Sequence, residues 1–232
     1  TSKGKYFDVD DTARFQVYAG FSAQTPSTNE AIKQTRGEVL THNGDVIVAF
    51  FHAYSGGRTD SAKNIFGNEV VYCKGKPEIF PRQELKDELS PKSKWIVEWT
   101  TEWSDKKSFL KKLKSANALK KQLASFNELH DYSISEMSLN RDFNSVVNLQ
   151  FSQDRNTTSV DSKLIRKAIG WSKFPSYHYR LLINDNDEVA FRGNGWGHHV
   201  GLSQWGAFIM AKNYNKTYEE ILYHYYTDVE LK

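Results

Sequence analysis

The chain has 232 residues, of which 39% are hydrophobic and 25% are charged, and its formal net charge is only +3. This length allows one large domain or two small ones, and the composition is typical of a globular protein with a sizeable core. So small a net charge gives no support for a nucleic-acid partner. The one cysteine, Cys73, excludes an intramolecular disulfide and any multi-cysteine metal site. No apolar run approaches the roughly 18 residues that a membrane-spanning helix needs.

The first part of the chain is predicted to form short strands and one clear hairpin. Residues 1–20 have the alternating apolar positions of two short strands, and residues 26–29 can cap a short helical turn over residues 30–34. The hairpin is predicted over residues 38–51. Its turn contains Asn43-Gly44 between two apolar runs, and both residues accept the positive φ that a tight hairpin turn requires.

The middle of the chain is predicted to contain a loop, a strand and a long helix. Residues 74–94 hold three prolines and are expected to be mostly loop, whereas residues 95–103 alternate as a strand does. Apolar residues recur at three- and four-residue steps over residues 106–129, which predicts one long amphipathic helix. We interpret residues 104–130 as a helical insertion. Its lysines fit a solvated helix face better than a surface for an acidic partner.

The last part of the chain is predicted to alternate strands with helices. The expected strands are residues 132–140, residues 145–153 and a hairpin over residues 179–192; the expected helices are residues 161–169, residues 203–212 and a final helix whose capping box is Thr217 with Glu220. Because strands and helices are interleaved in this mixed order, the sequence predicts an α+β fold with several hairpins and a few helices.

Two glycine-rich segments stand out from these elements. The segment Gly193–Ala207 reads GNGWGHHVGLSQWGA and combines five glycines with two histidines and two tryptophans. Glycine costs about 1 kcal/mol in a regular element, so this composition is typical of a loop that forms the wall of a site. The second segment, residues 52–60, reads HAYSGGRTD and follows the predicted hairpin strand directly. A connector with two buried tryptophans is the alternative interpretation of the first segment.

The two segments together carry a family resemblance. The first resembles the C-terminal signature of the stage II sporulation protein D family, whose usual form is close to GRGWGHGVGMSQWGA. The stretch AFFHAYSGGRTDSAKNIFG, from residue 49 to residue 67, resembles the other signature of that family. Residues 34–47, which include the first strand and the turn of the predicted hairpin, match a hairpin segment of the family, and the C-terminal residues 218–231 match a further segment. The resemblance therefore extends from about Asp8 to the C-terminus and is weakest around the predicted long helix.

The resemblance implies a lytic transglycosylase of the bacterial cell wall. Members of this family cleave the MurNAc–GlcNAc linkage of glycan strands stripped of their stem peptides and leave 1,6-anhydro ends. Such chemistry needs one carboxylic acid of raised pKa that first donates and then accepts a proton, with donors and flat apolar faces to hold the sugars. The implied partners are peptidoglycan glycan strands and other cell-wall remodelling proteins such as amidases. No nucleic-acid partner is expected. The implied location is extracytoplasmic, in the periplasm, cell wall or forespore-engulfment space.

The two segments are predicted to form a substrate cleft. The residues that we expect to bind substrate are His52, Ser55, Gly56, Gly57, Arg58, Thr59, Gly195, Trp196, His198, Ser203 and Gln204. Some of these residues also fit structural roles. His52 suits a buried structural histidine, the tryptophans of the first segment suit core positions, and the glycines serve to shape turns. Asp60 is expected to act in a turn or as a helix cap.

The sequence departs from the family pattern in two respects. The family's catalytic glutamate belongs to a Glu-Met-Pro-like motif on a helix upstream of the segment matching residues 7–20, and no such motif occurs in this chain. The first residue is Thr1 and not an initiator methionine, so we expect a fragment of an active enzyme whose catalytic glutamate lies before Thr1. Residues 1–232 are then a single domain that lacks its catalytic helix, with no catalytic residue in this chain.

Two alternatives to this interpretation remain. One is a non-catalytic module that binds glycan or enhances an amidase, in which case the homologue simply lacks the acid. The other is a Ser-His hydrolase, which would need a G-x-S-x-G motif that the sequence around Ser203 does not supply.

The second departure concerns metal. Some relatives carry a Cys-x-x-x-His-Cys cluster that can hold zinc, in the segment matching Asp10–Phe15. Here the matching positions are Asp10, Arg14 and Phe15, and neither an arginine nor a phenylalanine can bind zinc. The sequence therefore predicts no metal and no cofactor. Cys73 is expected to be a small buried apolar residue, and His199 stands where the family usually has glycine.

Overall fold

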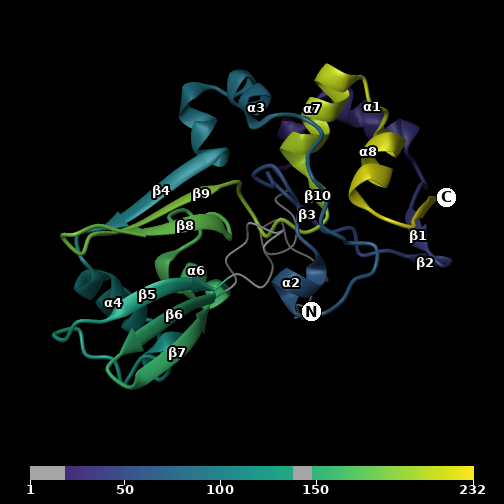
Figure 1. Cartoon of the computed structure of the whole chain (residues 1–232). Coiled ribbons are helices and arrows are strands. Elements are labelled where there is room, and N and C mark those ends of the chain that lie inside the picture. The colour runs from purple at the N-terminus through teal and green to yellow at the C-terminus, as the bar shows by residue number, and fades with distance from the viewer. Residues whose placement is uncertain (1–18, 138–147) are drawn as a thin grey trace. The chain divides into compact units, whose positions relative to one another are not determined.

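A computed structural model describes residues 19–137 and 148–232, and these residues form an α+β structure, as predicted (Figure 1). The chain divides into two compact units, one comprising Thr1–Val39 with Leu231–Lys232 and the other Leu40–Glu230. None of the helices in the described ranges is both long and apolar enough to cross a membrane.

Three of the sequence predictions fall on the first 18 residues and lie outside the described residues. They are the two strands predicted within residues 1–20, the positions matching the family's zinc cluster, and the start at Thr1, before which the catalytic glutamate is expected. The structure therefore does not test whether the acid precedes Thr1, and that expectation stays a prediction.

The smaller unit contains a 3-10 helix, η1 (Phe21–Ala23), and helix α1 (Pro26–Gln34). The N-cap of α1 is Thr25, whose hydroxyl accepts from the backbone N–H of Thr28 in a reciprocal capping box. The helix therefore begins earlier than the predicted turn, because Pro26 at the first helical position has no N–H to leave unpaired and a fixed φ that suits a helix. The unit also includes a reciprocal pair of backbone hydrogen bonds between Val39 and Lys232.

The predicted hairpin at the start of the larger unit is confirmed but is shorter than expected. Strands β1 (Leu40–His42) and β2 (Asp45–Val46) pair in antiparallel fashion around Asn43 and Gly44, both of which have positive φ. The chain leaves the hairpin after Ile47. The backbone N–H of Val48 donates to the Tyr72 hydroxyl, and a tight turn follows. The apolar run therefore continues as a separate strand, β3 (Phe51–His52), with a different partner.

That partner comes from the far end of the chain. Strand β3 pairs in parallel with β10 (Leu202–Ser203) (Figure 1). The register aligns Phe51 with Leu202. Parallel neighbours require a long connection between them, and here it contains most of the larger unit. The pairing therefore joins the two glycine-rich segments that the sequence singles out.

Two three-stranded antiparallel sheets lie within this connection. The first has the order β4–β9–β8, with β4 at Glu98–Trp103, β8 at His178–Ile183 and β9 at Val189–Asn194. The β8–β9 hairpin is as predicted. The second sheet has the order β5–β6–β7, with β5 at Ser133–Met137, β6 at Asn148–Gln153 and β7 at Asn156–Asp161. Residues 138–140 and 145–147 of the predicted strands lie outside the described residues. The sequence did not predict β7, because its mostly polar residues give a weak strand signal.

The prediction of one long helix over residues 106–129 is wrong. The structure has α4 (Lys106–Lys114) and α5 (Asn117–Lys120), and between them Ala116 is extended. The break turns the chain so that Leu113, Leu119 and Phe126, on both sides of it, bury their side chains in one core. A straight helix would have carried the later residues away from that core. The periodicity correctly identified the buried residues but not the turn between them.

The remaining elements are helices and one short strand. Those that the sequence predicted are α6 (Ser162–Ile169), α7 (Gln204–Tyr214) and α8 (Tyr218–Tyr225), and the capping box of Thr217 with Glu220 is present. Those that it did not predict are α2 (Ala62–Phe66), α3 (Arg82–Glu88), the 3-10 helix η2 (Pro91–Ile96) and the short strand β11 (Glu230–Leu231). Trp95 therefore lies in η2 and not in the predicted strand. Cys73 is buried, as expected.

The close approach of β3 and β10 gives a stability prediction. Gly201 has φ +73, and a Cβ there would overlap the carbonyl oxygen of Phe50. We expect Gly201→Ala to lower the free energy of unfolding by at least about 2 kcal/mol, since both strain and backbone overlap oppose it. The matched control is Gly67→Ala, where φ is +82 but nothing lies within 4 Å of the added carbon. The control should lose only about 1 kcal/mol. Equal losses in urea denaturation would contradict the close-approach argument.

Candidate functional site

Backbone hydrogen bonds fasten the two glycine-rich segments to each other over most of their length. Tyr54 and Trp196 exchange two of these bonds, with N···O distances of 3.1 and 2.8 Å, and the Asp60 N–H donates to the His199 carbonyl at 2.7 Å. The Trp205 N–H donates to the carbonyl of Ala53. We call residues 50–60 together with residues 194–205 the two-loop junction. The structure thus brings together the two segments in which all the predicted site residues lie.

Gly195 shows how tightly the junction is packed. Its φ is +80, and a Cβ there would come within 2.7 Å of the Tyr54 carbonyl oxygen and 2.8 Å of the Gly56 nitrogen. Contacts this short are not tolerated, so only glycine fits at this position. Gly195 and Gly56 are themselves buried, and Gly57 is partly buried. These glycines shape the junction.

A carboxylate on a third segment joins the hydroxyl groups of the junction. The Ser55 hydroxyl and the Tyr225 hydroxyl each donate to Glu78 at 2.5 Å, and Ser203 also bonds to this carboxyl. Burial raises the pKa of Glu78 above its usual range, while the three hydroxyls act in the opposite direction. Ser55 and Ser203 are therefore buried and hydrogen-bonded within the protein. Their contact with substrate stays a prediction.

Arginine and threonine side chains fix the outer edges of the junction. Arg82 of α3 donates to the Asn194 side-chain oxygen at 2.8 Å and to the Gly56 carbonyl at 3.3 Å. Arg58 donates to the Gly75 carbonyl, and the buried Thr59 exchanges hydrogen bonds with the backbone of Lys76. Arg58 and Thr59 thus hold the segment that carries Glu78.

An open hollow of about 450 Å³ lies beside the junction. Trp196 is partly buried, and its ring centroid is 4.1 Å from that of Trp95, whose side chain is 44% exposed. Both tryptophans line the hollow, together with Glu98, Trp99, Thr100, Thr101, Ser172, Lys173 and Pro175. Aromatic faces beside hydroxyl groups are the surface that a sugar ring requires. Trp205 instead packs against the core that contains Tyr54 and Ile209.

The two predicted histidines do not line this hollow. His52 is buried, and its Nδ1 lies 3.3 Å from the Val200 carbonyl oxygen. His198 is partly buried, and its Nδ1 accepts from the Val200 N–H at 3.0 Å. Burial lowers the pKa of both side chains, and that of His198 falls to about 4. Both imidazoles are therefore neutral at physiological pH. Gln204 is exposed at the first position of α7.

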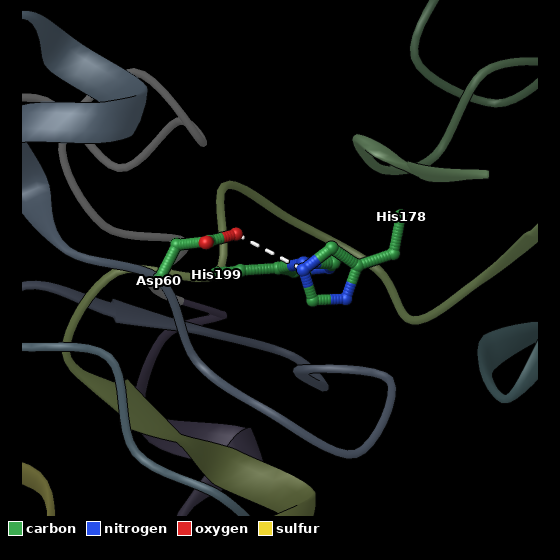
Figure 2. A group of neighbouring side chains, drawn as sticks. All are labelled: Asp60, His178 and His199. Atoms are coloured by element: carbon green, nitrogen blue, oxygen red, sulfur yellow. Dashed lines mark hydrogen bonds and ion pairs between the residues drawn. The ribbon is translucent and has the colours of Figure 1, made fainter. Parts of the chain in front are cut away.

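The structure also assembles three residues that the sequence did not group together (Figure 2). The Asp60 Oδ2 and the His178 Nε2 lie 3.0 Å apart, and the His199 ring packs edge-on against that of His178 at a centroid distance of 4.1 Å. The expected turn or cap role of Asp60 is wrong, because Ser61 is the N-cap of α2 and Asp60 is fully buried against His178. His178 carried no sequence signal, since it lies at the start of an ordinary strand far from either motif.

A family model and several known proteins resemble this chain in sequence. A family model described as "Stage II sporulation protein" matches residues 1–42. An uncharacterized protein of Brachyspira hyodysenteriae is 31% identical over 225 residues, which cover 97% of this chain and 54% of that protein. The amidase enhancer of Bacillus subtilis is 29% identical and stage II sporulation protein D of Bacillus subtilis is 25% identical, each over 96% of this chain.

These matches confirm the resemblance to the stage II sporulation protein D family. The chain covers 35% of the amidase enhancer and 59% of the Bacillus subtilis stage II sporulation protein D. The chain thus spans between about a third and three-fifths of the length of these relatives.

The environment of Glu78 gives a pH-dependent prediction. A raised folded-state pKa means that the carboxyl group stabilises the fold most below its unfolded pKa, and this contribution is lost as the pH rises through the folded pKa. Glu78→Gln removes the charge, so its stability relative to wild type should increase between about pH 4 and pH 7. Glu78→Ala should cost roughly 2–4 kcal/mol, because three hydroxyls lose their acceptor.

The matched control for this experiment is Glu102→Gln, an exposed residue on β4. Its stability relative to wild type should change little over the same pH range. Urea denaturation at several pH values measures all three variants. A pH-independent difference between Glu78→Gln and wild type would show that the carboxyl carries no burial penalty.

Proposed function

We propose that this protein binds peptide-stripped peptidoglycan glycan in the hollow beside the two-loop junction and acts in cell-wall remodelling outside the cytoplasm. Similarity to the stage II sporulation protein D family supports the substrate class. The observation that carries the proposal is the Trp95–Trp196 pair, which offers partly exposed indole faces in an open hollow. Sugars stack their C–H faces on such rings, while neighbouring hydroxyls and charged groups hydrogen-bond to their edges.

We further propose that the reaction is lytic transglycosylation, with the general acid supplied by a glutamate before Thr1. A suitable acid needs both a raised pKa and access to substrate. Of the carboxyl groups near the hollow in the described part of the chain, Glu98 is exposed, but hydrogen bonding to Lys86 lowers its pKa. Glu78 has a raised pKa, but three hydroxyls occupy its carboxyl group. Neither of these two described residues meets both requirements, which agrees with an acid supplied by another part of the protein.

A second candidate function is that of a non-catalytic module that binds glycan or stimulates an amidase. The match to the amidase enhancer of Bacillus subtilis favours it. Both candidates share the glycan hollow and differ only in turnover. Amidases and other remodelling proteins are the partners that the second candidate requires.

Binding tests the part that both functions share. Trp196→Ala should weaken the affinity for denuded glycan strands by at least about tenfold, because it removes a central stacking face worth more than about 1 kcal/mol. The matched control is Trp171→Ala, since Trp171 is 67% exposed and does not line the hollow. Isothermal titration calorimetry with denuded glycan oligomers measures both. Equal affinities of the two variants for glycan would show that the glycan binds outside this hollow.

Turnover distinguishes the two functions. The natural full-length protein and residues 1–232 are each incubated with denuded glycan, and the products are analysed by mass spectrometry. We expect 1,6-anhydro ends from the full-length protein and none from residues 1–232. Their absence from both reactions would rule out the transglycosylase and leave the binding module. Their production by residues 1–232 would show that the acid lies within this chain and not before Thr1.

A further inference from the structure

The strongest unexplained feature of the larger unit is the cluster of Asp60, His178 and His199. Each residue offers one ligand atom, and these atoms all lie within 4.8 Å of one another. All three side chains are buried, with exposed fractions of 0% for Asp60, 5% for His178 and 0% for His199. They come from three different segments, namely the two segments of the two-loop junction and the start of β8 (Figure 2). None of them lines the aromatic hollow.

The environment of His199 is costly for a histidine. Both of its ring nitrogens are buried, and neither has a hydrogen-bond partner among the residues that the structure describes. A buried polar atom without a hydrogen-bond partner destabilises the fold. The residue also has φ 61, in the left-handed region that favours glycine. Neither cost would arise with glycine at this position, so the imidazole itself requires an explanation.

The donor atoms of the cluster suit a metal ion. Imidazole nitrogen and carboxylate oxygen are both ligands that zinc takes in proteins, and the cluster offers two of the first and one of the second. A cation bound between His178 and Asp60 would replace the proton that these two side chains share. The displaced proton would pass to solvent.

The geometry is close to that of a zinc site. Zinc binds imidazole nitrogen and carboxylate oxygen at about 2.0–2.2 Å, so its ligand atoms lie about 3.3 Å apart in a tetrahedron. The separation of 3.0 Å between the Asp60 Oδ2 and the His178 Nε2 is close to this value, and no separation among the three ligand atoms exceeds 4.8 Å. His52 is a candidate for a fourth ligand. Its Nε2 is buried without a described partner, its Nδ1 lies 3.3 Å from the Val200 carbonyl oxygen, and its ring centroid is 5.5 Å from that of His199.

We propose that Asp60, His178 and His199 form a zinc-binding site that fastens the two-loop junction to strand β8. Since all the ligands are buried, the zinc serves a structural purpose and does not act on substrate. Its ligands are different residues from those that match the Cys-x-x-x-His-Cys cluster of some relatives. The proposal does not depend on glycan binding, because the site lies outside the aromatic hollow.

The test compares zinc binding and thermal stability in two variants and a control. His199→Gly removes one ligand and places glycine where φ is positive, so this variant should fold. Asp60→Asn preserves the shape of the second ligand and removes its charge. The control is His130→Ala, which removes an exposed histidine outside the cluster. Each protein is stripped with a chelator, titrated with zinc chloride by calorimetry and melted with and without one equivalent of zinc.

We expect one zinc ion per wild-type chain and per His130→Ala chain, and an affinity at least about 100-fold weaker in His199→Gly and Asp60→Asn. Stability should show a crossover. Without zinc, His199→Gly should melt at a higher temperature than wild type; with zinc, only wild type and the control should shift upward, and the order should reverse. Cobalt substitution should give the visible absorption of a tetrahedral site in wild type and the control but in neither ligand variant. Absence of zinc binding by wild type, or equal affinity in His199→Gly, would overturn the proposal.

Discussion

The structure depends on the parallel pairing of β3 with β10, which extends through the backbone bonds of Tyr54 with Trp196 and of Asp60 with His199. This pairing joins segments that most of the larger unit separates along the sequence. Bringing such distant segments together costs chain entropy, so the contacts that form must be close and numerous. The glycines at residues 195 and 201 permit that closeness, because a Cβ at either position would overlap backbone atoms of the other segment.

The junction buries two sets of polar groups, and the two sets differ in how far they are hydrogen-bonded. On one side, Glu78 accepts hydrogen bonds from hydroxyls of both segments and of helix α8, so a partly buried acid holds three elements together. On the other side, Asp60 and His178 pair, while His199 and His52 carry nitrogens without a described partner. A fully satisfied polar network fixes a unique packing, whereas an unsatisfied one is costly. This asymmetry is what the zinc site would remove.

The surfaces of the junction differ in what they offer to other molecules. Trp196 turns its indole into the hollow shared with Trp95, whereas Ser55, Thr59 and Ser203 are enclosed by the protein. The motif residues therefore divide into those that hold the backbone and those that face solvent. In the proposed function, the solvent-facing residues recognise the substrate, and the residues that hold the backbone keep them in place.

The sequence by itself determined the α+β class, the β8–β9 hairpin, the capped helices α7 and α8 and the two segments that form the junction. These features depend on local patterns, namely the alternation of strands, the capping box and the glycine-rich motifs. The sequence also identified the apolar residues around α4 and α5, but only the core decided that the chain turns at Ala116. The meeting of Asp60 with His178 and His199, and the pairing of Trp95 with Trp196, was decided by tertiary structure alone. These partners are far apart in the chain, and no local preference records which side chains a folded sheet brings together.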